Sequence, residues 1–224
     1  MKFLLCAIAL ASTTFAAQAA PATPIDDLYN TSWTTSEGQQ DTHYTVTTPA
    51  GKTTQGWSTD TDTGYPVKKG PWIDNSQISS WDTPSQNPAA HEPVGHYLWK
   101  TTFNLTGYDA ATASFDGRFA ADGNAIAYLN GHEIGVTPTK GYSSWSSFAA
   151  NSQYFVAGLN TVSFNVHNLA GATGLRVEFL QSEVMATAPV QPQAVEAIPE
   201  PETYALMLAG LAALGVVARR RKAA

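Results

Sequence analysis

The stretch Tyr97-Leu-Trp-Lys-Thr-Thr-Phe103 decides the fold, because its side chains alternate between two kinds of surface. One face of an extended chain would carry Tyr97, Trp99, Thr101 and Phe103. The other would carry Leu98, Lys100 and Thr102. A period of two with large apolar residues on one side predicts a β-strand that lies against a core.

The same alternation recurs in short segments bounded by turn residues, and the predicted strands are residues 28–35, 42–48, 76–81, 112–120, 125–129, 132–136, 160–168 and 174–180. Asn130-Gly131 lies between two of them and predicts a type I′ hairpin, because both residues tolerate positive φ. Strands spaced about ten residues apart predict an all-β fold, a two-sheet antiparallel sandwich of jelly-roll type. The core candidates are Phe103, Phe115, Phe119, Leu129, Phe164, Val166, Leu175 and Val177.

Both ends of the chain have the composition of processing signals. Residues 1–19 predict a signal peptide, with Ala17 and Ala19 at the cleavage positions and Ala20 as the first mature residue. Cys6, the single cysteine, lies inside this segment, so we expect no disulfide in the mature domain. Residues 20–182 are the predicted β-sandwich domain, and residues 183–197, rich in Ala, Pro, Val and Gln, are a predicted disordered spacer.

The predicted mature chain is acidic. Without Lys2 and the four cations near the C-terminus, seven basic residues stand against 18 acidic ones, a net charge of −11 for residues 20–218. A domain this acidic is a poor candidate for binding nucleic acid or anionic lipid headgroups, because like charges repel. We therefore expect neutral partners, cations or an exported matrix component.

Residues 198–224 have three parts in order: Pro199-Glu200-Pro201, an apolar helix predicted at 204–218, and a basic tail at 219–222 that includes Arg219, Arg220 and Arg221. The 15 apolar residues are fewer than the roughly 20 that cross a bilayer comfortably, although thinning and snorkelling flanks accommodate shorter spans. The basic tail should stay cytoplasmic, with the bulk of the chain on the other side. An ordinary C-terminal anchor after a Pro-Glu-Pro linker is the alternative.

This tail resembles the PEP-CTERM sorting signal of Gram-negative bacteria that make extracellular polysaccharide. The resemblance implies recognition by an exosortase, a membrane cysteine peptidase, with Pro199, Glu200 and Pro201 as substrate residues. It also implies export across the cytoplasmic membrane after signal peptidase cleavage, transient anchoring by the C-terminal helix, and a final place at the cell surface or outside the cell.

Residues 112–178 also resemble a recurring globular cargo of PEP-CTERM proteins. The residues that carry the likeness are Thr112-Ala113, Gly117, Ala121-Asp122-Gly123-Asn124, Leu129-Asn130-Gly131, Phe148, Phe155 to Asn160, Val166, Asn168 and Thr173 to Glu178. Such domains resemble galactose-binding-like jelly rolls, the architecture of many carbohydrate-binding modules. The likeness implies a fold more than a function, since this architecture hosts many activities.

The candidate enzyme motifs in the sequence depart from the known catalytic patterns, and we expect a non-catalytic protein. His91-Glu92-Pro93-Val94-Gly95-His96 nearly spells a zinc protease helix, but the second histidine comes one residue late, and proline and glycine oppose a helix. His43, His132 and His167 stand alone in strand contexts, where surface or structural roles are the expectation. Carboxylate pairs for glycoside hydrolysis could be drawn from Asp116, Asp122, Glu133 and Glu178, but nothing singles them out.

Calcium is the one cofactor with a sequence signal. Asp60 and Asp62 alternate before Gly64, as ligands of a calcium loop would, and Asp122-Gly123-Asn124 is a second candidate. No distal bidentate acid follows Asp62, so turns stabilised by Asp and Asn side chains are the alternative.

Sugar binding is the sharpest functional hypothesis, because aromatic faces stack on pyranose rings while polar groups hold the hydroxyls. The predicted ligand-binding residues are Asp122, Asn124, Asn130, Tyr142, Trp145, Phe148 and Asn168. Trp57, Trp72 and Trp81 lie in or beside the irregular region 56–95, and Trp81 and Trp99 are expected to fill the core instead.

The sequence thus predicts an exported carbohydrate-binding module for extracellular polysaccharide. The alternatives are a structural or adhesive matrix protein without sugar specificity, and a hydrolase on the same fold.

Overall fold

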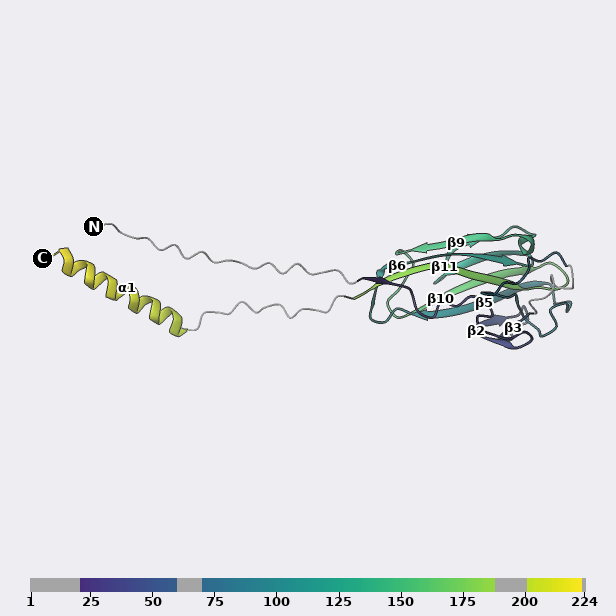
Figure 1. Ribbon diagram of the computed structural model, residues 1–224, viewed down its shortest axis with the longest axis horizontal. Helices are drawn as coiled ribbons and strands as arrows, with labels where there is room; N and C mark the ends of the chain where they lie inside the picture. Colours follow the sequence, from purple (N-terminus) through teal and green to yellow (C-terminus); the bar gives the residue numbers. More distant parts are fainter. Residues whose placement is uncertain (1–20, 60–69, 188–200, 223–224) are drawn as a thin grey trace. The chain divides into compact units, whose positions relative to one another are not determined.

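The computed structural model describes residues 21–59, 70–187 and 201–222. They belong to two compact units, one up to Ala188 and one from Pro189 onward, and each is described by itself. Figure 1 shows the first unit as a β-domain and the second as a helix.

The strands are β1 (Ala22–Thr23), β2 (Gln40–Thr47), β3 (Thr53–Ser58), β4 (Asp82–Thr83), β5 (Gly95–Asn104), β6 (Tyr108–Ala121), β7 (Asn124–Leu129), β8 (His132–Val136), β9 (Ser146–Asn151), β10 (Leu159–Asn168) and β11 (Leu175–Ala186). A single 3-10 turn, η1 (Gly141–Ser143), precedes β9 within the described β-domain.

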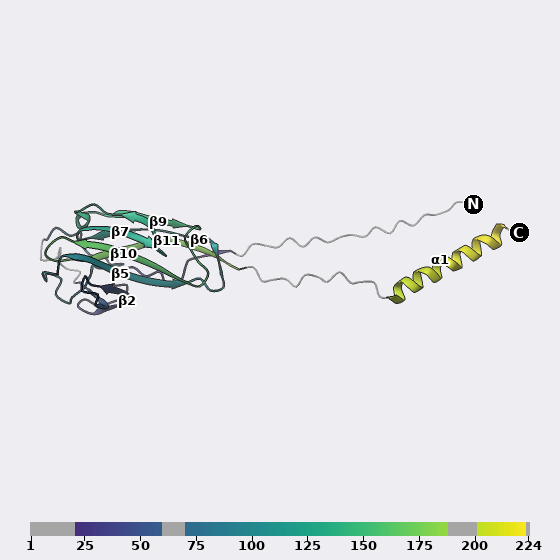
Figure 2. The same ribbon diagram turned by 180° about the vertical axis from the view of Figure 1, so that it is seen from behind.

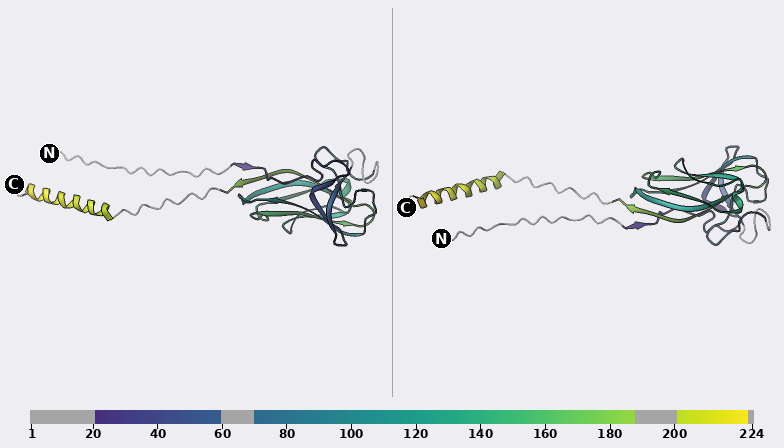
Figure 3. Two further views of the ribbon diagram at one scale, coloured as in Figure 1. Left: turned by 90° about the horizontal axis from the view of Figure 1, so that it is seen from below. Right: turned by 90° about the horizontal axis from the view of Figure 1, so that it is seen from above.

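The strands form one continuous antiparallel path in the order β8-β7-β10-β5-β2-β3-β4-β11-β6-β9, with β1 paired to β11. The path folds over itself into two layers, which Figure 3 shows from two sides. Figure 2 shows β7, β10 and β5 side by side in one layer. The predicted sandwich is confirmed as an all-β antiparallel fold, with the short strands β3 and β4 making the two layers continuous.

The main core lies between the layers. Phe164 of β10 meets Phe119 of β6 and Phe148 of β9, with ring centroids 5.4 Å and 5.7 Å apart. All eight predicted core residues are buried there, which confirms the inward faces read from the alternation. Trp81 and Trp99 are also fully buried, as expected.

The Asn130-Gly131 hairpin is confirmed. Asn130 has φ 51° and Gly131 has φ 86°, and they connect β7 to β8. Positive φ at both central residues is the signature of a type I′ turn, whose twist matches that of the flanking strands.

Two predicted strands are wrong. Residues 28–35 form turns, because Ser32 and Thr34 have φ 57° and 56°, which an extended chain does not allow. Residues 76–81 form a loop in which the Ser76 N–H donates to the Ser79 carbonyl.

Four strands of the structure were not predicted, namely β1, β3, β4 and β9. The strand β11 continues to Ala186, beyond the predicted domain end at residue 182 and into the first part of the predicted spacer. The rest of that spacer lies outside the described residues.

The second unit contains the helix α1 (Pro201–Lys222), which includes the predicted helix at 204–218 and the basic tail. Proline suits the first position of a helix because its missing N–H would have no partner there. In the described part of the chain, no helix combines the length and the apolar character that crossing a membrane requires. Ala17, Ala19, Ala20, Pro199 and Glu200 lie outside the described residues.

Candidate functional site

A second, smaller core lies on the outer face of β6 and β11. Trp72, Trp81, Ala120 and Ala172 are buried in it, and Ile73, Tyr142 and Trp145 pack against it partly buried. Residues 71–81, which we call the cover loop, contribute most of its large side chains. A hydrogen bond of 2.9 Å from the Ile73 N–H to the Tyr142 carbonyl ties the cover loop to the turn before β9. Two predicted ligand-binding residues, Tyr142 and Trp145, therefore meet here.

Asp122, a third predicted ligand-binding residue, joins the same region. Its Oδ2 accepts a hydrogen bond of 3.0 Å from the Trp72 indole nitrogen. Burial raises the pKa of Asp122 to about 6, although the hydrogen bond from Trp72 acts in the opposite direction. The carboxyl group therefore titrates close to neutrality rather than in the usual acidic range.

Trp145 lies over two cations. The guanidinium carbon of Arg118 is 4.4 Å from the centroid of the indole ring, and that of Arg176 is 4.7 Å from it. Cations placed over an indole are attracted by its negative π face. Since Trp145 is only partly buried, the ring is held in place and yet remains open to solvent.

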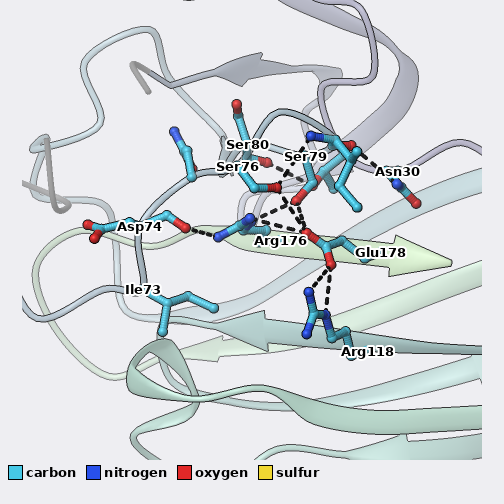
Figure 4. Close-up of polar contacts among 12 residues, drawn as sticks. Asn30, Ile73, Asp74, Ser76, Ser79, Ser80, Arg118, Arg176 and Glu178 are labelled. Atoms are coloured by element: carbon cyan, nitrogen blue, oxygen red, sulfur yellow. Dashed lines mark hydrogen bonds and ion pairs between the residues drawn. The ribbon is translucent and has the colours of Figure 1, made fainter. Parts of the chain in front are cut away.

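The two arginines are fixed by one buried acid, Glu178, which is 0% exposed (Figure 4). Arg118 donates to Glu178 Oε2 from Nε at 2.7 Å and from Nη2 at 2.6 Å. Arg176 donates to Oε1 from Nη2 at 3.2 Å. The two arginines approach Glu178 from β6 and from its own strand, so three charges form one network with a net charge of +1.

The cover loop completes this network. Ser79 and Ser76 donate their hydroxyl protons to Glu178 Oε1 at 2.7 Å and 3.2 Å. Arg176 donates from Nε to the Ser79 hydroxyl at 2.8 Å and from Nη1 to the Asp74 carbonyl. The network thus fastens the cover loop to the sheet beneath it.

Burial and hydrogen bonds compete in setting the charges of the network. Burial raises the pKa of Glu178, but the hydrogen bonds from Ser79 and Arg118 and the charge of Arg176 outweigh it, and the pKa lies below its usual value. Burial lowers the pKa of Arg176 to about 10, against the opposing charge of Glu178. Glu178 and Arg176 are therefore both ionised at neutral pH.

A polar surface continues from Trp145 along the outer face of the sheet. We define the polar face by five residues, namely Ser114, Asp116 and Arg118 of β6, Ser147 of β9 and Gln181 of β11. Arg118 is opposite Ser147, and Asp116 is opposite Gln181, so these side chains share one face. A shallow cavity of about 140 Å³ opens on it, lined by residues 114–116 and 181–183. The polar face thus combines an aromatic ring at one end with hydrogen-bonding groups along its length.

Three predicted ligand-binding residues have structural roles instead. Phe148 is 2% exposed and packs in the main core, because the segment around it is the strand β9 rather than a loop. Asn130 Nδ2 donates to the Tyr154 carbonyl and to Asn160 Oδ1, each at 2.8 Å. Asn168 is 1% exposed, and its Nδ2 donates to the Glu92 and Pro93 carbonyls at 3.0 Å and 3.1 Å.

Asn124, the remaining predicted residue, begins β7 and lies opposite His167 of β10. It is on a different sheet layer from the polar face.

The sequence interpretation missed Arg118, Arg176 and the function of Glu178 as their shared partner. The available signal was alternation, since Arg118 precedes the inward Phe119, and Arg176 and Glu178 flank the inward Val177. Alternation places each of them on an outer face, but it does not reveal that β6 pairs with β11.

The metal that the sequence predicts is calcium. The predicted calcium residues Asp60 and Asp62 lie outside the described residues. Across residues 21–59, 70–187 and 201–222, no three His, Cys, Asp or Glu side chains are grouped so that they could hold a metal ion. Asp41 and Asp82 are 0% exposed, so they cannot reach a ligand in solvent, and burial raises the pKa of both.

Several solved structures resemble parts of the β-domain at low similarity. A lectin from Pleurotus ostreatus in complex with GalNAc has 20% identity and a TM-score of 0.36, over 47% of this chain and 32% of that chain. The apo form of the same lectin has 20% identity and a TM-score of 0.35, over 49% of this chain and 35% of that chain. This chain therefore spans about a third of the length of the lectin chains it matches.

A third likeness is to the CBM36-1 domain of a multidomain xylanase from the hindgut metagenome of Trinervitermes trinervoides. It has 15% identity and a TM-score of 0.24, over 38% of this chain and 72% of that chain. No curated protein matches the chain significantly in sequence. The C-terminal residues 197–222 match the PEP-CTERM protein-sorting motif, and this chain therefore carries a signal that implies export and sorting to the cell surface.

Proposed function

We propose that this protein is exported, processed by signal peptidase and an exosortase, and retained at the cell surface or in the matrix by binding extracellular polysaccharide. Its C-terminal helix holds the chain at the cytoplasmic membrane before processing. The β-domain binds the glycan without catalysing a reaction, and the polar face together with Trp145 is the binding surface.

The observation that carries this proposal is the placement of Trp145 over Arg118 and Arg176. A sugar platform requires an aromatic ring that is flat, accessible and already ordered, because ordering a ring on binding costs free energy. Two guanidinium groups fixed by a buried acid order this ring in the unbound protein. The part of the indole that is exposed to solvent can then stack on the C–H face of a pyranose.

Polar groups next to the ring would hold the hydroxyl groups of the sugar. Arg118 uses Nε and Nη2 for Glu178, and its side chain is 39% exposed, so Nη1 is placed to donate to a ligand. Asp116 and Gln181 follow along the strands and supply acceptors and a donor. The shallow cavity suits a chain that lies along the surface rather than a small molecule that is enclosed.

A non-catalytic function agrees with the state of Glu178. Glu178 is fully buried, and five donors occupy its two oxygens. A glycosidase needs two carboxyl groups that flank the scissile bond, one of them as an acid or base in contact with the sugar. Glu178 cannot act in that way while it holds the arginines.

The test is affinity electrophoresis of the full-length protein in gels that contain the producing cell's own extracellular polysaccharide. We expect wild-type migration to slow as polysaccharide concentration rises, and Trp145→Ala to abolish this retardation while the thermal unfolding temperature stays within a few degrees. Trp33→Ala is the matched control, because Trp33 is 40% exposed but lies away from the polar face, beside Leu28 and Phe179.

Retardation that survives Trp145→Ala would place the binding surface elsewhere. Retardation lost in Trp33→Ala and kept in Trp145→Ala would assign it to the pocket that Trp33 lines together with Leu28 and Phe179. A folded wild-type protein that shows no retardation at any polysaccharide concentration would contradict glycan binding and favour a structural role in the matrix.

A further inference from the structure

Two histidines far apart in the sequence lie together on the outer face of the layer that contains β5 and β10. His96 of β5 and His167 of β10 are directly opposite in the antiparallel ladder. Their rings stack with centroids 4.4 Å apart and an angle of 9° between the planes. The neighbouring Tyr97 and Val166 are fully buried, so the alternation of each strand turns both imidazoles away from the core.

The hydrogen bonding of His96 fixes its tautomer. Its Nδ1 lies 2.9 Å from Asn165 Oδ1, and an amide oxygen can only accept a hydrogen bond. Nδ1 therefore carries the proton and donates, which leaves the lone pair of the neutral ring on Nε2. Histidines that bind metals are oriented in the same way, with one ring nitrogen donating to an oxygen and the other free to coordinate.

We propose that His96 and His167 together bind a divalent transition-metal ion of the Zn²⁺ or Cu²⁺ class, with water completing the coordination. Imidazole nitrogen is a preferred ligand for these ions and a poor one for Ca²⁺ or Mg²⁺. The site lies on β5 and β10, away from the polar face of β6, β9 and β11, so it is independent of glycan binding there.

The spacing of the rings suits one shared ion. With metal–nitrogen distances near 2.0–2.1 Å, two nitrogens on a tetrahedral ion are about 3.3 Å apart. The stacked rings are 4.4 Å apart between centroids with 9° between their planes, so each side chain must turn out of the stack before both lone pairs point at one ion. The paired strands already hold the two backbones in place. The conformational cost of binding therefore comes from the side-chain rotations.

The experiment is isothermal titration of ZnCl₂, and separately CuCl₂, into the full-length protein purified in detergent without a polyhistidine tag. We expect one equivalent to bind, and His96→Gln and His167→Gln each to weaken binding by about tenfold or more. His132→Gln is the matched control, because His132 stacks on the Tyr154 ring at 4.4 Å and 11° and so has a phenol ring rather than a second imidazole beside it. It should leave the affinity unchanged.

His167→Phe separates loss of a ligand from loss of packing, since it keeps a stacked ring and removes the nitrogen. It should bind as weakly as His167→Gln while keeping the thermal stability of the wild type. Zinc affinity that is unchanged in both His167 variants, or that falls equally in His132→Gln, would overturn the proposal. So would the absence of a saturable heat of binding in the wild type.

Discussion

Glu178 is the residue that holds the candidate site together. It receives donors from the sheet, through Arg118 and Arg176, and from the cover loop, through Ser76 and Ser79. A buried ion pair adds little net stability by itself, but removing one partner leaves the other charge buried without compensation. The chief consequence of losing Glu178 would fall on Arg176, which is 2% exposed.

We expect Glu178→Gln to lower the free energy of unfolding by about 3 kcal/mol at pH 7. The pKa of Glu178 is lowered in the folded protein, so its stabilising contribution is present above the ordinary glutamate pKa and is lost as the pH falls through the folded value. Urea unfolding from pH 7 down to pH 3 should therefore show a smaller acid-dependent loss in the variant than in the wild type.

Glu183→Gln is the control for that change. Glu183 is exposed, lies on the same strand, and accepts one hydrogen bond of 3.3 Å from Ser114. Its replacement should alter stability by less than about 0.5 kcal/mol. Equal losses in the two variants would mean that the network around Glu178 contributes nothing beyond surface charge.

At the scale of elements, the sequence predicted strands wherever alternation and a turn signal agreed. The hairpin at Asn130-Gly131 is the clearest case, because local chemistry alone specifies its positive φ values. The segment 28–35 alternates too, but Ser32 donates its backbone N–H to the buried carboxylate of Asp41 at 2.6 Å, and this hydrogen bond to the next strand holds a turn. The strand β9 was missed because Ser, Ala and Asn around Phe148 have weak strand preference, and pairing with β6 decides their conformation.

Two predictions concern Asn130, one as a turn residue and one as a ligand-binding residue. The turn is confirmed. We expect Asn130→Ala to lower the free energy of unfolding by about 1–3 kcal/mol, because it removes hydrogen bonds to Tyr154, Asn160 and the Thr161 N–H and puts alanine at positive φ.

Asn104→Ala is the comparison for the hairpin variant, since exposed Asn104 accepts only local hydrogen bonds, from the backbone and hydroxyl of Thr106. Denaturant unfolding of both variants measures the difference. If the Asn130 variant were no less stable than the Asn104 variant, the hairpin would owe its stability to packing of β7 and β8 rather than to the asparagine.

At the scale of the whole molecule, the fold class followed from the sequence but the candidate site did not. Alternation shows which side chains face a core, whatever the order of the strands. The site, however, joins Arg118 and Arg176 from two strands to a cover loop and to Trp145, which are separated by tens of residues. Only the pairing of β6 with β11 and β9 brings them together, and alternation fixes faces without fixing partners.

Sorting and retention should be separable, because the sorting motif at residues 197–222 lies in one unit and the polar face in the other. We expect replacement of Pro199, Glu200 and Pro201 by alanine to block processing, so that the protein stays with the membrane fraction at its unprocessed mass. Trp145→Ala should be processed normally and reach the outside, yet be washed from the matrix by buffer that leaves the wild type bound. Fractionation of producing cells followed by intact mass measurement distinguishes these outcomes.

If the alanine replacement were exported and trimmed like the wild type, the motif would not direct processing. If Trp145→Ala stayed with the matrix, retention would depend on the tail or on a surface other than the polar face.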